Sequence, residues 1–140
     1  MLDYENNTIP IRALVVDDEK PIIEMLDSIL STFGIQEIYI AYNGEEGLNM
    51  FNKHSPDIVI TDYYMPIMDG VELYKAIKIA RPEIPVIFFT GQEKKVAARL
   101  EIDGLKPDYI VSKVFLRIEM IADIFKECFP DYNFTELKFS

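Results

Sequence analysis

The segment Pro56-Asp57-Ile58-Val59-Ile60-Thr61-Asp62 gives the clearest indication of how this 140-residue chain folds. A turn at its start is followed by an uninterrupted apolar run, and the run stops at an acidic residue. A strand without polar alternation is typical of a parallel sheet in which helices cover both faces. The segment therefore predicts a buried strand that delivers Asp62 to the carboxyl end of a parallel sheet.

Short apolar runs alternate with helical patterns on both sides of this strand. We expect strands at residues 11–16, 37–41, 58–61, 85–89 and 109–111. We expect helices at about 21–33, after Asn43-Gly44, and at about 71–80, 93–102 and 116–128. Because neighbouring parallel strands need helical crossovers, this alternation predicts an α/β fold with a single parallel sheet covered on both faces.

The chain has the size and composition of one globular domain. It is 49% hydrophobic and 27% charged, which supports one sizeable core and leaves no room for a second folded domain. We expect the domain at residues 11–128, between a polar leader at 1–10 and a C-terminal tail or linker start at 129–140. Four large apolar side chains in the tail suggest that it docks on the domain: Tyr132, Phe134, Leu137 and Phe139.

Charge and cysteine content exclude several classes of protein. The 24 acidic and 14 basic residues give a formal net charge of -10, which repels nucleic acid phosphates, so we expect no direct nucleic acid binding. The single cysteine, Cys128, cannot form an internal disulfide. The sequence has neither a secretory signal pattern nor an apolar run long enough to span a bilayer. These features predict a cytoplasmic protein without a membrane anchor.

Polar residues follow four of the five predicted strands. Ligands of open parallel sheets bind beyond the carboxyl ends of the strands. The residues expected there are Asp17-Asp18-Glu19, Asp62, Thr90 and Lys113. Converging carboxylates repel one another unless a cation compensates them, and a ligand set made only of oxygen favours Mg²⁺ over zinc. A metal, a carboxylate nucleophile, a hydroxyl and a lysine together can hold a phosphoryl group, which predicts aspartyl phosphate chemistry.

Each of these residues also has a purely structural interpretation. Taken alone, Asp17-Asp18 is explained more simply as a helix N-cap with a solvated neighbour, and Lys113 as a surface lysine. The joint pattern favours a shared site, because an acidic pair, an aspartate, a hydroxyl and a lysine follow the first, third, fourth and fifth strands in order.

The chain resembles the receiver domains of two-component response regulators over residues 11–128. The matching motifs are Val16-Asp17-Asp18-Glu19, Ala41-Tyr42-Asn43-Gly44-Glu45-Glu46-Gly47-Leu48, the stretch 56–62, Met65-Pro66-Ile67-Met68-Asp69-Gly70, Pro85-Val86-Ile87-Phe88-Phe89-Thr90-Gly91, and Lys113 before Phe115. The resemblance implies a flavodoxin-like (βα)5 three-layer sandwich with strand order 2-1-3-4-5.

The resemblance also implies a role for each site residue. Asp62 would accept a phosphoryl group from a sensor histidine kinase or a phosphotransfer protein, and Thr90 and Lys113 would bind the phosphoryl oxygens. The implied Mg²⁺ ligands are Asp17, Asp18, Asp62 and the backbone carbonyl of Tyr64. Such a domain is a signalling phosphoacceptor, with only self-catalysed phosphotransfer and autodephosphorylation, rather than a conventional enzyme.

The implied output is a changed interaction surface. In the family, the residue at the place of Thr90 moves toward the phosphoryl group and remodels the face made by the fourth helix, the fifth strand and the fifth helix. The partner of that face would be a downstream protein, a fused output domain or a second copy of the chain.

Two positions depart from the family pattern. Val114 stands where the family has a proline joined by a cis peptide, and a cis bond before a non-proline residue costs about 3–4 kcal/mol, so we expect a trans peptide here. Ile110 stands where the family has its switch aromatic, with Tyr109 one residue earlier. In addition, Tyr64 is bulky enough to obstruct the water that hydrolyses the phosphoryl group.

Three other functions compete with this interpretation. A phosphorylation-independent pseudo-receiver would keep the fold and signal by constitutive contacts, and the departures at Ile110 and Val114 favour it. A flavodoxin needs phosphate-binding donors after the first strand, where Asp17-Asp18-Glu19 would instead repel a flavin phosphate. Phosphatases with an aspartate nucleophile carry it after the first strand and have a substrate cap, which this sequence does not predict.

Overall fold

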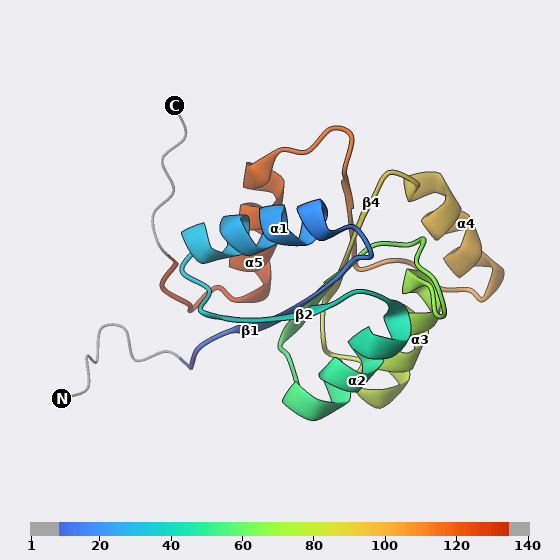
Figure 1. The fold of residues 1–140 in the computed structure, drawn as a ribbon, viewed down its shortest axis with the longest axis horizontal. Helices are drawn as coiled ribbons and strands as arrows, with labels where there is room; N and C mark the ends of the chain where they lie inside the picture. Colours follow the sequence, from blue (N-terminus) through green and yellow to red (C-terminus); the bar gives the residue numbers. More distant parts are fainter. Residues whose placement is uncertain (1–8, 135–140) are drawn as a thin grey trace.

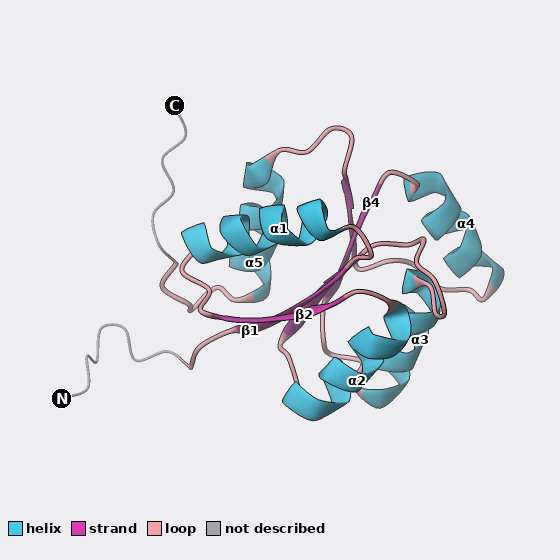
Figure 2. Cartoon of the chain, viewed as in Figure 1, coloured by secondary structure: helices cyan, strands magenta, loops and turns pink. Residues whose placement is uncertain are grey.

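The computed structural model describes residues 9–134, which form five parallel strands and five helices. The strands lie in the order β2-β1-β3-β4-β5. Helices α1 and α5 cover one face of this sheet, and α2, α3 and α4 cover the other (Figure 1). Figure 2 shows the sheet as the middle of three layers. The predicted flavodoxin-like (βα)5 fold with strand order 2-1-3-4-5 is confirmed.

The strands and helices alternate along the chain as predicted. The strands are β1 (Arg12–Val16), β2 (Glu37–Ala41), β3 (Ile58–Thr61), β4 (Val86–Thr90) and β5 (Tyr109–Ser112). The helices are α1 (Lys20–Thr32), α2 (Gly44–His54), α3 (Gly70–Ala80), α4 (Glu93–Ile102) and α5 (Ile118–Cys128). The bounds of β2, β3 and α4 match the prediction, and most of the others differ by one residue.

Helix α5 begins at Ile118, two residues later than predicted. The side-chain oxygen of Ser112 accepts hydrogen bonds from the backbone N–H groups of Val114 and Phe115, at 3.0 and 3.1 Å. These bonds hold the chain in a turn after β5, and the backbone is still extended at Arg117. Helical periodicity in the sequence does not reveal such a local side-chain bond, so the predicted start was too early.

Strand β3 is buried along its whole length, as its apolar sequence predicts. Ile58 and Ile60 belong to the core between the sheet and helices α1 and α5, whereas Val59 belongs to the core beneath α2, α3 and α4. The strand pairs with β1 on one side and with β4 on the other. Its backbone is therefore fixed from both sides, and so is the position of the residue that follows it.

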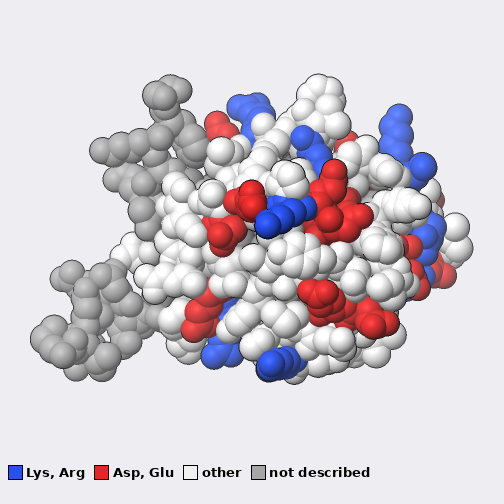
Figure 3. Space-filling model, in the orientation of Figure 1, with Lys and Arg blue, Asp and Glu red and all other residues white. Residues whose placement is uncertain are grey.

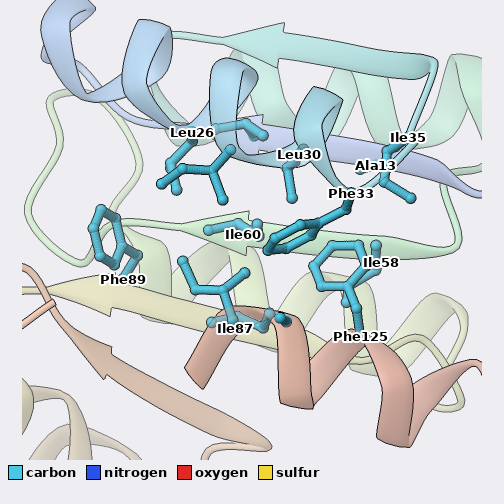
Figure 4. Packing of buried hydrophobic residues seen from close by; sticks show 14 of the residues in the cluster. Ala13, Leu26, Leu30, Phe33, Ile35, Ile58, Ile60, Ile87, Phe89 and Phe125 are labelled. Carbon is cyan, nitrogen blue, oxygen red and sulfur yellow. The ribbon is translucent and has the colours of Figure 1, made fainter. Parts of the chain in front are cut away.

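Aliphatic side chains make up most of the core on the α1 and α5 side, and the rings of Phe33, Phe89 and Phe125 pack among them. The rings of Phe33 and Phe125 meet edge to face with their centroids 5.9 Å apart (Figure 4). Phe89 of β4 and Ile87 pack into the same core. Burial of such large side chains is a main source of folding free energy, at roughly 1.5–3 kcal/mol for each fully buried apolar side chain.

The described part of the expected C-terminal tail packs against this core. Tyr132 and Phe134 contact it, and the Tyr132 hydroxyl donates a hydrogen bond to the backbone carbonyl of Gly34 at 3.4 Å. Leu137 and Phe139, the other apolar residues noted in the tail, lie outside the described residues. The tail is thus docked as far as Phe134.

The surface carries both signs of charge. On the face shown in Figure 3, Asp and Glu side chains form several clusters with Lys and Arg side chains between them. This face offers no continuous basic surface to a nucleic acid backbone. Among the described helices, none has the length and apolar character needed to cross a bilayer.

Gly70, the first residue of α3, is predicted to be intolerant of a side chain. Its N–H donates to the Tyr63 carbonyl at 2.8 Å, and a Cβ on Gly70 would lie 1.9 Å from the backbone oxygen of Asp62. Gly70→Ala should lower the free energy of unfolding by about 1–3 kcal/mol, because the backbone after β3 must move.

Gly91→Ala is the matched control for chemical denaturation. A Cβ on Gly91 would meet only a methyl group of Val114, at 3.9 Å. Its unfolding free energy should stay within about 0.5 kcal/mol of wild type. Equal stability of the two variants would contradict the close approach at Gly70.

Candidate functional site

The predicted site residues lie at the carboxyl edge of the sheet. Asp17 and Asp62 directly follow the neighbouring strands β1 and β3, and the Asp62 N–H still donates to the Val16 carbonyl at 3.0 Å. The Lys113 N–H donates to the Thr90 carbonyl at 3.0 Å, which extends the β4–β5 ladder by one bond. The four side chains are therefore placed by the regular sheet rather than by loops.

These positions are buried although the side chains are polar. Asp17 is 1% exposed, Asp62 8% and Thr90 1%. Buried carboxylates destabilise a fold unless charges or hydrogen bonds compensate them. The compensation available at this edge determines what the site can do.

Lys113 provides the main compensation within the chain. Its ammonium nitrogen lies 2.8 Å from Oδ2 of Asp62, 2.8 Å from Oδ2 of Asp17 and 3.1 Å from a carboxylate oxygen of Glu19. Burial on its own would lower the pKa of the lysine, but its hydrogen bonds and its attraction to Asp17 and Asp62 together raise that pKa above its usual value. Lys113 is therefore a permanent cation at neutral pH.

The negative charge at the edge exceeds what one lysine can neutralise. Asp17, Asp18, Glu19 and Asp62 each contribute a carboxylate oxygen to a group whose atoms all lie within 4.8 Å of one another. Burial raises the pKa of Asp17 above its usual value, although the lysine and the Glu19 N–H partly oppose this effect. One ammonium beside four carboxylates leaves an excess of acceptors for a further cation.

Asp17 in particular has an incomplete set of partners. Its Oδ1 accepts the backbone N–H of Glu19 at 2.9 Å. Its Oδ2 lies within ion-pair distance of Lys113, but within residues 9–134 no donor makes a well-aligned hydrogen bond with it. A buried carboxylate oxygen without an aligned donor, surrounded by other carboxylate oxygens, suits a hard divalent cation such as Mg²⁺. The residues present thus fit the predicted metal.

Both oxygens of Asp62 have donors. Oδ1 accepts the backbone N–H of Tyr63 at 2.7 Å, and Oδ2 accepts the ammonium of Lys113 at 2.8 Å. This pair of bonds fixes the orientation of the carboxylate. A carboxylate held in this way beside a cation can act as an oriented nucleophile, or as an ion-pair partner only.

Thr90 is held at the next strand end. Its hydroxyl oxygen accepts the backbone N–H of Gln92 at 3.0 Å, so in this structure it is bonded to the loop after β4. As an acceptor in that bond, the hydroxyl keeps its own proton for another partner. The structure thus places Thr90 beside the site without a direct bond to Asp62.

The structure brings some predicted residues into contact and leaves others apart. Asp17, Asp62 and Lys113 touch one another, and exposed Asp18 adds an oxygen to the same cluster. The Tyr64 side chain is 66% exposed, and its backbone carbonyl stays a predicted ligand.

Sequence reasoning did not assign a role to two groups at the site. The contact of Glu19 with Lys113 could have been inferred from its place next to the acidic pair. The N–H of Tyr63 on Asp62 is a backbone group, which every residue other than proline has, so no residue type signals it.

The two departures from the family pattern have structural counterparts. No cis peptide occurs in the described part of the chain, so the bond before Val114 is trans, as predicted. Ile110 packs into the core beneath α3 and α4, whereas Tyr109 faces the α1 and α5 side, where its hydroxyl oxygen lies 3.6 Å from Sγ of Cys128. An aliphatic residue therefore occupies the place of the switch aromatic.

Comparison with solved structures identifies similar chains. CheY of Borrelia burgdorferi, crystallised in complex with CheX, beryllium fluoride and magnesium, superposes with a TM-score of 0.75 at 26% identity, covering 91% of this chain and 95% of that one. A two-component transcriptional regulator from Clostridium phytofermentans gives a TM-score of 0.72 at 28% identity, with 86% and 93% coverage. A receiver domain protein from Clostridium thermocellum gives 0.73 at 27%, with 86% and 94% coverage.

A family model agrees with these structural similarities. The model described as "Response regulator receiver domain" matches residues 13–125, which include β1 from its second residue on, the other four strands and most of α5. That range also contains all the side chains gathered at the carboxyl edge: Asp17, Asp18, Glu19, Asp62, Thr90 and Lys113. The chain belongs to the response regulator receiver domain family, whose members are phosphoacceptor switches of two-component signalling.

Proposed function

We propose that the chain is an active phosphoacceptor switch in which Asp62 receives a phosphoryl group in the presence of Mg²⁺. One observation carries the proposal: the Lys113 ammonium lies 2.8 Å from both Asp62 and Asp17 at a buried edge that still has more carboxylate oxygens than cations. A module that signals only by constitutive contacts has no physical need for such a costly cluster.

In the proposed reaction, a carboxylate oxygen of Asp62 attacks the phosphorus of a phosphohistidine. The new O–P bond forms as the P–N bond breaks, and the imidazole nitrogen leaves with the bonding electron pair. Lys113, whose ammonium already contacts this carboxylate, would stabilise the negative charge on the phosphoryl oxygens. After the transfer, the Thr90 hydroxyl would donate to a phosphoryl oxygen.

Asp17, Asp62 and the Tyr64 carbonyl would hold the metal, with Asp18 contributing directly or through water. Mg²⁺ supplies neutralisation of the phosphoryl oxygens when it is bound. The buried Asp17 oxygen without an aligned donor supports this ligand set. The proposed donor is a sensor histidine kinase or a phosphotransfer protein in the cytoplasm.

The proposed output is the face formed by α4, β5 and α5. Thr90 lies at the start of the loop that leads into α4, so a movement of its hydroxyl would be transmitted to that helix. The face would then bind a downstream protein, a fused output domain or a second copy of the chain. The pseudo-receiver remains the second candidate, because Ile110 removes the aromatic ring through which Thr90 usually acts.

Phosphoryl transfer to Asp62 is predicted to be observable by intact-mass analysis after incubation with acetyl phosphate. The wild-type chain should gain the mass of one phosphoryl group with Mg²⁺ and none after chelation. Asp62→Ala should gain none under either condition. Asp131→Ala removes an exposed carboxylate beyond α5 and should behave as wild type. A folded wild-type chain that gains no mass would favour the pseudo-receiver.

Asp17→Asn is predicted to separate metal binding from folding. Because burial raises the pKa of Asp17 in the fold above its usual value, ionising this carboxyl costs folding free energy at a pH above both values. Asparagine carries no charge and avoids that cost, so the variant should be at least as stable as wild type in chelator. At a free Mg²⁺ concentration about tenfold above its Kd, binding should stabilise wild type by roughly 1.4 kcal/mol, which raises Tm by about 5 °C. The variant should lose this increase.

Thermal melts with and without Mg²⁺ test this prediction. Asp131→Asn carries the same change at an exposed position and should keep the wild-type response. If Asp17→Asn retains the full Mg²⁺ shift, Asp17 is not a metal ligand.

Tyr64→Asn is predicted to shorten the lifetime of the phosphorylated chain several-fold. The large, exposed Tyr64 ring stands two residues after the acceptor, where it would obstruct the hydrolytic water. A smaller side chain should open that approach. The loss of phosphoryl mass with time after removal of the donor measures the half-life, and a longer half-life in the variant would rule out this obstruction.

A further inference from the structure

A three-residue contact ties α4 to the loop that follows Asp62. One guanidinium nitrogen of Arg99 donates to the Tyr63 hydroxyl at 3.1 Å and lies 3.2 Å from Oδ2 of Asp69. The guanidinium also lies over the Tyr63 ring, 5.9 Å from its centroid. Such a cation–π contact combined with a hydrogen bond fixes both partners in one relative orientation.

The same tyrosine reaches the acceptor carboxylate through its backbone. Its N–H donates to Oδ1 of Asp62 at 2.7 Å. Tyr63 is thus bonded to the acceptor carboxylate at its main chain and to α4 at its side chain. A displacement of its backbone would therefore move its hydroxyl relative to Arg99.

The far end of the loop is anchored on α3. Asp69 caps α3 in a reciprocal capping box with Glu72, and the Gly70 N–H donates to the Tyr63 carbonyl. Helix α4, by contrast, buries only Val96 and Leu100 along its length. A helix with few buried side chains depends more on each polar anchor, and it is the element that can move at least cost.

The usual route from Thr90 to this helix is altered. Ile110 occupies the place of the switch aromatic, and Tyr109 faces the opposite side of the sheet. The Tyr63–Arg99 contact provides an aromatic link on the α4 side that starts from the acceptor residue itself.

We propose that Tyr63 and Arg99 couple the phosphorylation state of Asp62 to the position of α4, an inference that rests on the proposed function. When Asp62 becomes an acyl phosphate, its carboxylate loses the charge that makes Oδ1 a strong acceptor for the Tyr63 N–H. The backbone of Tyr63 shifts, its hydroxyl leaves Arg99, and α4 is released. The contact thus stabilises the phosphoryl-free arrangement.

Thermodynamic linkage predicts in which direction the affinity for a phosphoryl mimic changes when this contact is removed. If the contact favours the phosphoryl-free arrangement, removing it must increase the affinity of the site for a phosphoryl mimic. The two effects are reciprocal: the factor by which the affinity rises equals the factor by which phosphorylation weakens the contact. A contact that merely stabilises the fold would not change that affinity. The affinity for beryllium fluoride, which imitates a phosphoryl group on a carboxylate, therefore distinguishes the two roles.

The experiment measures beryllium fluoride affinity with Mg²⁺ and hydrogen exchange of α4 in four chains: wild type, Tyr63→Phe, Arg99→Gln and the double variant. Tyr63→Phe removes only the hydroxyl and keeps the ring, so its fold is preserved. Lys94→Gln removes an exposed charge from the same helix and is the matched control.

Each single variant should bind beryllium fluoride about fivefold more tightly than wild type, within the usual range of coupling between sites. The double variant should bind no more tightly than Arg99→Gln, because that single change already removes the hydrogen bond to Tyr63 together with the ion pair to Asp69. In wild type, exchange of α4 amides should become about fivefold faster on binding, whereas in the variants it should be fast before binding and change little. Lys94→Gln should match wild type in both respects.

The alternative outcomes are distinct. A wild-type chain that binds no beryllium fluoride overturns the proposed function and this inference together. Wild-type binding with unchanged affinity in Tyr63→Phe and Arg99→Gln overturns the coupling alone, even if α4 exchanges faster, because the contact would then be structural only.

Discussion

Four carboxylates share the carboxyl edge of the sheet with a single lysine, and the proposed metal binding and phosphoryl transfer both depend on this imbalance of charge. Lys113 contacts Asp17, Glu19 and Asp62 at once, yet it neutralises only one of them. Asp17 and Asp62 are buried whereas Asp18 and Glu19 are exposed, so the carboxylates converge where the core meets solvent, and their surplus negative charge favours binding of a cation. In the proposed function this surplus makes the site responsive, because a metal and a phosphoryl group would bind to the carboxylates that Lys113 now contacts.

The sheet and the loop after β3 hold the carboxylates close together. Strand β3 is fixed between β1 and β4 and buried on both faces, so Asp62 cannot retreat into solvent. Close approach of Gly70 to the Asp62 backbone keeps the loop after β3 near the carboxylate. The tight core therefore supplies rigidity at the edge, while α4, with only two buried side chains, supplies the element that can move.

Much of this could be predicted from the sequence, for a physical reason. An apolar run such as Ile58–Thr61 has few stable environments other than a doubly covered parallel strand, and strand ends in such a sheet converge. The Tyr63–Arg99 contact could not be predicted, because its residues stand 36 positions apart and belong to no motif. The late start of α5 depends on Ser112 bonding to its own turn, a local choice that periodicity does not encode.

Chemical trapping would show whether Asp62 itself carries the phosphoryl group. Borohydride reduces an aspartyl phosphate to homoserine, and peptide mass spectrometry then locates the altered position. After incubation with acetyl phosphate and Mg²⁺, we expect conversion at Asp62 alone. Conversion at Asp17 or Asp18, or at no position in a folded chain with Mg²⁺ bound, would contradict this expectation.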